Sequence, residues 1–120
     1  MRIAAGVLIV VVAALHVYFL VLEMFLWRTL FGRRTFQTTP DVAESSAVLA
    51  ANQGLYNGFL AAGLFWALIW FGIPGGRAVL TFFLGCVIVA GIYGAATVSR
   101  RILLVQAVPA AVALVLLWLA

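Results

Sequence analysis

Charged residues, cysteine and histidine are all scarce in this chain of 120 residues. Only 8% of the residues are charged, there is one cysteine and one histidine, and all seven basic residues are arginine. The single Cys86 excludes an internal disulfide and a metal site made of cysteines alone. One histidine, with no second acidic residue inside an apolar segment, gives poor support to a metal site. The chain also lacks a glycine-rich phosphate loop and a nucleophile elbow. We therefore expect no metal or other cofactor.

Apolar residues dominate instead. They make up 68% of the chain, and the mean hydropathy is +1.27. A soluble domain of this length leaves too much of its surface exposed to hide so many apolar side chains, so the solvent must be lipid. The net charge of +4 comes from arginines that flank the apolar segments. Because no aromatics interleave with them, they favour anchoring at a membrane face over nucleic-acid binding.

Four apolar segments are long enough to cross a bilayer as helices of about 20 residues. They cover residues 3–27, 46–71, 78–98 and 102–120. We predict one domain, residues 1–120, that folds as an all-α integral membrane four-helix bundle. A cleavable signal peptide over residues 1–14 is the alternative for the first segment. Its hydrophobicity, however, continues to Trp27, well past a short signal core.

The linkers predict an orientation in the membrane. A basic linker ends at Thr39, which can cap the next helix, and Pro40 suits the first helical position. The second and third segments are joined by a glycine-rich turn at residues 72–76. Five arginines lie in the linkers after the first and third segments, against two elsewhere. The positive-inside rule then places those linkers in the cytoplasm and both termini outside.

Polar side chains inside the apolar segments mark the candidate site. They fall in the same half of the expected bilayer: His16, Glu23, Asn52, Gln53, Tyr56 and Asn57. A polar group in hydrocarbon is costly without a partner, so such groups indicate a functional site by default. Tyr93 and Gln106 lie at a similar depth on the third and fourth segments.

Helical periodicity arranges these residues into faces. His16 and Glu23 share one face of the first helix, two turns and about 10 Å apart along its axis. On the second helix the polar residues fit an arc of about 120°, which we expect to line a polar interior. A neighbouring stripe of small residues allows another helix to approach closely: Ala47, Ala51, Gly54, Gly58 and Ala62.

Structural interpretations of the same residues stay open. Glu23 could pair with Arg28 or Arg100 at the membrane interface. Buried without a cation, it would instead be a proton carrier or a general acid. His16 could be a neutral packed histidine, and the amides could simply hydrogen-bond neighbouring helices. Trp27 lies near the end of a segment, as an interfacial aromatic belt requires.

Two segments carry a family resemblance. They are HVYFLVLEMFLW at residues 16–27 and AANQGLYNGFLAAG at residues 50–63. On these segments, and over nearly its whole length, the chain resembles the small bacterial membrane proteins of domain-of-unknown-function family thirteen-zero-four. The resemblance implies a four-helix topology in the inner membrane of a bacterium, and no established activity.

Three functions are compatible with this pattern. The first is a site for a small, mostly apolar or amphipathic molecule, where Glu23 and His16 exchange protons in an isomerisation or another proton transfer. The ligand would contact Asn52, Gln53, Tyr56, Asn57, Trp27 and Tyr93. The second is a proton-coupled exporter, although the arginine bias argues against an antiparallel dimer. The third is a structural or assembly role, a homo-oligomer included, driven by the stripe of small residues.

Overall fold

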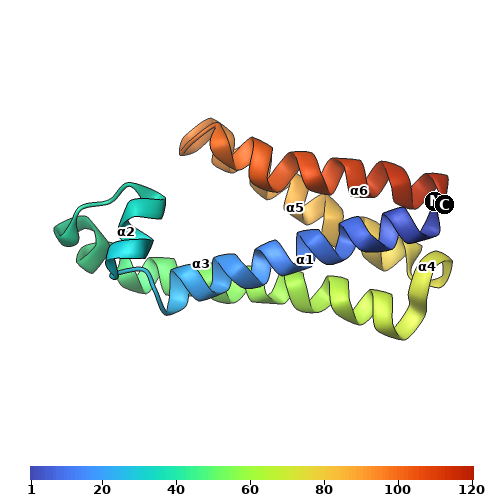
Figure 1. The fold of residues 1–120 in the computed structure, drawn as a ribbon, viewed down its shortest axis with the longest axis horizontal. Helices are drawn as coiled ribbons and strands as arrows, with labels where there is room; N and C mark the ends of the chain where they lie inside the picture. Colours follow the sequence, from blue (N-terminus) through green and yellow to red (C-terminus); the bar gives the residue numbers. More distant parts are fainter. The chain divides into compact units, whose positions relative to one another are not determined.

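The computed structural model describes residues 1–120, whose regular structure is entirely helical, with short turns between the helices and no β-strand. The predicted all-α class is therefore confirmed. Figure 1 shows the helices in chain order: α1 (Arg2–Met24), α2 (Leu30–Phe36), α3 (Pro40–Trp66), the π-helix η1 (Ala67–Phe71), α4 (Gly72–Gly75), α5 (Arg77–Thr97), the π-helix η2 (Leu103–Ala107) and α6 (Val108–Leu119).

Three helical stretches are long and apolar enough to cross a membrane, namely Arg2–Met24, Pro40–Gly75 and Arg77–Thr97. The last apolar helix, Leu103–Leu119, is shorter. At the helical rise it is about 26 Å long, close to the lower limit for a span. These lengths and compositions are compatible with a membrane protein.

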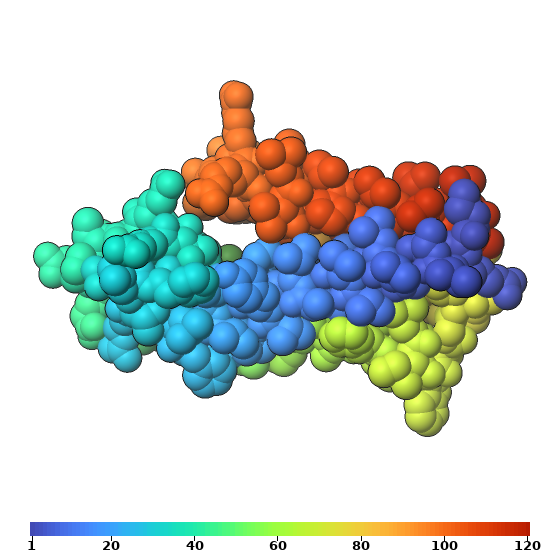
Figure 2. Space-filling model, in the orientation of Figure 1, coloured from blue at the N-terminus to red at the C-terminus, as the bar shows by residue number.

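The basic linker contains a short helix that the sequence pattern did not predict. Thr29 caps α2, because its side-chain oxygen accepts a hydrogen bond from Gly32 N at 3.1 Å. The helix ends at Gln37, whose backbone is left-handed with φ 56°. Figure 2 shows this segment, in cyan, at the surface. Seven residues are too few to show a helical period, so α2 was not recognisable from hydropathy.

The start of α3 agrees with the prediction. Val42 N donates a hydrogen bond to Thr39 Oγ1 at 3.2 Å, so Thr39 caps a helix that begins at Pro40. At the other end, the predicted glycine-rich turn interrupts the helix. Gly72 has φ 69°, which suits glycine, and Ile73 has non-helical backbone angles inside α4.

The fourth predicted segment is helical but not regular, because η2 precedes Pro109. Proline has no N–H, and its ring clashes with the carbonyl four residues earlier, which is that of Val105. A wider π-helical turn accommodates such a ring. Hydrophobicity alone could not predict this change of helix type.

By their contacts, the residues form two compact units: residues 1–14 with 60–120, and residues 15–59. The first unit has an entirely apolar core, built by α1, α3, η1, α5 and α6: Ile9, Val12, Ala13, Leu64, Ala67, Leu80, Leu84, Val87, Ala110, Ala113 and Leu117. At Gly91 of α5, an added Cβ would lie 2.8 Å from the backbone nitrogen of Ala107. Glycine there lets α5 pack directly against the backbone of η2.

A polar cluster fastens α5 to the end of α6 in the first unit. Arg77 Nη2 donates to the backbone oxygen of Ala120 at 2.9 Å, and its guanidinium carbon lies 5.2 Å from the ring centroid of Trp118. Trp118 Nε1 donates to Thr81 Oγ1 at 3.0 Å. Figure 1 marks both chain termini at this end of the unit.

Candidate functional site

The unit of residues 15–59 is organised by close packing of α1 against α3, which lie side by side in Figure 1. A Cβ added at Gly54 would lie 2.8 Å from Met24 Cγ and 3.2 Å from the backbone oxygen of Leu20. At Gly58 it would lie 2.6 Å from Leu20 Cδ1. The close approach predicted from the small residues is confirmed at these two glycines.

Beside this contact, Glu23 of α1 meets Asn57 of α3. Asn57 Nδ2 donates a hydrogen bond to Glu23 Oε1 at 2.5 Å. Glu23 is only 6% exposed and Asn57 only 8%. The second carboxyl oxygen of Glu23 and the amide oxygen of Asn57 accept no hydrogen bond from the chain. The pair therefore retains two oxygen atoms that can accept hydrogen bonds from another molecule.

The arginine next along the chain does not neutralise Glu23. Arg28 Nη1 lies 3.3 Å from both carboxyl oxygens of Glu44, and both side chains are largely exposed. Glu23 takes part in no ion pair. The interfacial pair of Glu23 with Arg28 that the sequence left open is absent, because Arg28 lies beyond the end of α1 and reaches the first turns of α3.

Trp27 joins three elements of the same unit. Its Nε1 donates to Ser46 Oγ on α3 at 3.1 Å, and its ring centroid lies 4.7 Å from that of Phe36 on α2. The hydroxyl of Ser46 in turn donates to the carbonyl of Val42 at 2.6 Å. Trp27, in the turn that follows α1, thus links α2 and α3 four residues after Glu23.

His16 is fully buried on α1, and its ring meets that of Phe19 edge to face at 5.2 Å. It lies about 10 Å along the helix axis from Glu23, which is too far for direct contact. Burial agrees with both interpretations of His16, as a packed side chain and as a second proton-exchanging group.

The remaining amides and the tyrosine of α3 do not join Glu23. Asn52, Gln53 and Tyr56 are exposed, and only Asn57 of the predicted arc is buried. Asn52 lies about 140° around the helix from Asn57, so the polar residues span slightly more than the expected arc of about 120°. The expectation that the whole arc lines one interior is therefore not met within a single chain. Gly54 contacts α1 and turns that side of the helix inward, so the arc straddles the boundary between the buried and the exposed face.

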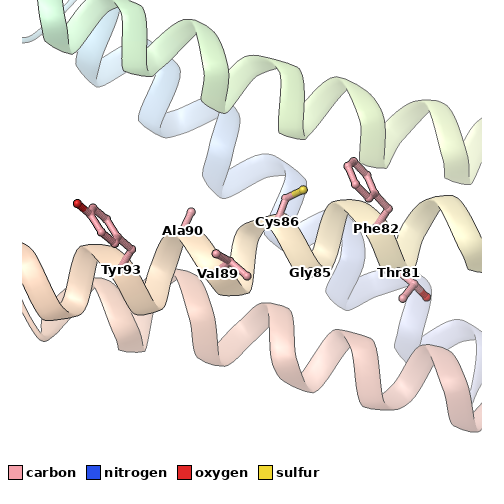
Figure 3. Close-up of a pocket in the computed structure, with 7 residues that line it drawn as sticks. All are labelled: Thr81, Phe82, Gly85, Cys86, Val89, Ala90 and Tyr93. Atoms are coloured by element: carbon pink, nitrogen blue, oxygen red, sulfur yellow. The ribbon is translucent and has the colours of Figure 1, made fainter.

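Tyr93 belongs to the other unit and is 71% exposed. It stands at one end of an open, apolar groove along α5, drawn in Figure 3, whose other lining residues are Thr81, Phe82, Gly85, Cys86, Val89 and Ala90. No charged side chain lines this groove. Its chemistry suits contact with apolar molecules and does not support proton transfer.

Two polar partners were not recognised from the sequence. Ser46, which accepts from Trp27, was included in the polar arc without a specific role. Arg77 was counted only for its charge, although it contacts Trp118 and Ala120. A usable signal existed, because Trp27 and Trp118 lie at the ends of segments and hydroxyl groups, those of Ser46 and Thr81, lie near the start of another segment.

Sequence comparison places these features in a family. The pattern of the family described as "Protein of unknown function (DUF1304)" matches residues 10–118. The "Uncharacterized protein YpaA" of Lactococcus lactis subsp. lactis (strain IL1403) is 31% identical to this chain over 117 residues, which cover 96% of this chain and 97% of YpaA. No solved structure matches the chain. The chain therefore belongs to the DUF1304 family, as the resemblance of its two polar segments indicated.

Proposed function

We propose that this chain is a four-span protein of a bacterial inner membrane, in which the Glu23–Asn57 pair binds the polar group of a small, mostly apolar molecule. The topology places both termini outside the cytoplasm. Three helices of spanning length and a fourth at the lower limit support it. The five arginines of the two predicted cytoplasmic linkers support the orientation.

One observation carries the binding proposal. Glu23 is a buried carboxyl whose partner is an amide and not an arginine. A carboxyl in this setting is expensive to maintain for packing alone, because an apolar side chain of similar volume would fill the space without a desolvation penalty. A carboxyl at this position is explained if it binds a ligand or carries a proton.

The two oxygens of the Glu23–Asn57 pair that accept no hydrogen bond within the chain indicate which polar group a ligand should carry. Glu23 and Asn57 each have one oxygen available, so together they suit a hydroxyl or an amine that donates hydrogen bonds. Leu20 and Met24, which contact α3 at Gly54 and Gly58, are apolar and suit a hydrocarbon body. A small amphipathic molecule that enters from the lipid meets both requirements.

The side chains of Glu23 and His16 support proton transfer. Glu23 as a carboxylate takes a proton from the bound molecule and protonated His16 donates one to it, or the reverse, so the molecule is isomerised without a net gain or loss of protons; the two side chains then exchange protons with solvent before the next turnover. Because His16 and Glu23 lie about 10 Å apart along α1, the substrate must extend over two helical turns to reach both.

Native mass spectrometry of the protein extracted gently from its own membrane tests the binding proposal. We expect the native chain to carry a discrete small molecule that Glu23→Ala and Asn57→Ala lose. Glu23→Gln keeps a hydrogen-bonding group and should retain part of it. Glu44→Gln, which makes the same change at an exposed carboxyl, should retain all of it. A native chain without a bound molecule, or full retention by Glu23→Ala, contradicts the proposal.

A structural role is the second candidate, and the pairing of α1 with α3 favours it. The Glu23–Asn57 and Trp27–Ser46 hydrogen bonds both connect these helices, as polar side chains commonly do in membranes. In that case the same variants would lose stability without any change in bound molecules.

A further inference from the structure

The outward face of α3 in the unit of residues 15–59 carries a heptad pattern. Ser45, Val48, Asn52, Leu55 and Phe59 follow the alternating three- and four-residue steps of a coiled-coil seam, and all five are exposed. On an α-helix they lie within about 60° of Asn52. Val48 is 75% exposed and Phe59 is 56% exposed. The chain itself leaves this face uncovered.

The other side of α3 is already occupied. Ala43, Ala50, Gly54 and Asn57 are buried there, and Gly54 and Asn57 contact α1. The helix therefore divides its surface into a packed side and an open side, and the open side includes Asn52.

Asn52 makes the open side unsuited to lipid. Its amide makes no hydrogen bond within the chain. It lies about 18 Å along the helix from Pro40, inside the stretch that is long and apolar enough to cross a membrane. Hydrocarbon offers no hydrogen bonds, so an amide at this depth needs a partner from outside the chain.

We propose that α3 pairs with α3 of a second copy of this chain, in a parallel dimer where the two Asn52 side chains bond to each other. An asparagine amide has both donors and acceptors, so it is complementary to its own copy. A two-fold axis along the membrane normal brings the same residue of both copies to the same depth.

The register follows from the position of Asn52. Asparagine at the first position of a heptad fixes the alignment and the number of helices in a parallel coiled coil. Val48 and Leu55 occupy the alternate positions of the seam, one turn on each side. Leu49 and Tyr56, 74% and 61% exposed, flank the seam and add packing surface. Apolar contact alone does not select one partner helix in lipid, because the lipid tails are equally apolar. The hydrogen bonds of Asn52 therefore provide the specificity of the pairing.

Single-molecule photobleaching of the full-length protein in vesicles, at several protein-to-lipid ratios, measures this association. We expect dimers whose association constant falls roughly five- to thirtyfold in Asn52→Ala, the range for losing an interhelical hydrogen bond. Asn52→Gln should retain most of the association. Val89→Ala, at an exposed position of α5, should match the native chain. Alanine is tolerated at an exposed helical position, so Asn52→Ala should still fold.

Disulfide cross-linking identifies the face in contact. In a Cys86→Ser background, single cysteines at positions 48, 55 and 59 should link two copies under a mild oxidant, and cysteines at the buried positions 43 and 50 should not. A monomer at every density, dimers unaffected by Asn52→Ala, or cross-links that follow the α5 face would overturn the proposal. A monomer that binds a lipid or small molecule through Asn52 would overturn it too, and would assign the face to that molecule.

Discussion

Glu23 and Asn57, 34 residues apart in the sequence, share a 2.5 Å hydrogen bond in the buried contact between α1 and α3. Both residues lie next to the point where Gly54 brings the two helices together. The hydrogen bond therefore depends on close packing of the backbone, while the nearest arginine along the chain, Arg28, pairs with Glu44 instead.

Removing the amide should destabilise the protein. Asn57→Ala leaves the carboxyl of Glu23 without its partner, and we expect a loss of about 0.5–2 kcal/mol in the free energy of unfolding. Glu23→Gln should lose less, because glutamine still offers an oxygen to Asn57. Reversible unfolding in mixed micelles, followed by circular dichroism, measures both. Gln53→Ala, an exposed amide on the same helix, is the control, and equal stability of Asn57→Ala and this control would disprove the pairing.

The close contact between α1 and α3 at Gly54 leads to a second prediction. In Gly54→Ala the new methyl group would lie 2.8 Å from Met24 Cγ and 3.0 Å from Glu23 Cβ, so α1 must move away from α3 and the protein should unfold more easily. Gly85→Ala is the matched control, since its methyl group meets nothing within 4 Å. It should be neutral or stabilising by up to about 1 kcal/mol. If the two variants have the same stability, the helices do not approach as described.

Trp27 and Ser46 should be energetically coupled. A double-mutant cycle with Trp27→Phe and Ser46→Ala should give a coupling free energy of about 0.5–1.5 kcal/mol, the range for a hydrogen bond between membrane helices. The same unfolding assay supplies the four values. Strictly additive effects would mean that the indole donates its hydrogen bond elsewhere.

The orientation is testable with thiol reagents that do not cross membranes. In a Cys86→Ser background, a cysteine at Gly75 should be labelled in intact cells. Cysteines at Thr35 and Ser99, beside the clustered arginines, should be labelled only after the membrane is opened. Labelling of all three positions in intact cells would instead indicate insertion in both orientations, and would favour the exporter hypothesis.

The helical class and the main helix boundaries could be predicted because they depend on long apolar runs and on local caps. Pro40 after Thr39 marked the start of α3, and Gly72 marked its interruption. The helix α2 could not be predicted, because its seven residues depend on the cap at Thr29 and not on a hydrophobic period.

The candidate site was predictable in part. Polar residues in apolar segments identified Glu23 and Asn57, which do meet. Helical periodicity gives the angles between Asn52, Gln53 and Asn57 around α3. It does not show which side of α3 is buried, because that depends on which helix packs at Gly54. Three of the four polar side chains of α3 were therefore expected inside and lie outside.

Solid-state NMR of the isotopically labelled protein in lipid bilayers shows which nitrogen lies next to the carboxyl carbon of Glu23, and so tests whether this carboxyl is buried against Asn57. We predict a correlation between Glu23 Cδ and Asn57 Nδ2 that disappears in Asn57→Ala and persists in Arg28→Gln. A correlation with an arginine guanidinium instead would contradict it, because Glu23 would then be an interfacial ion-pair partner and not a buried carboxyl available to a ligand.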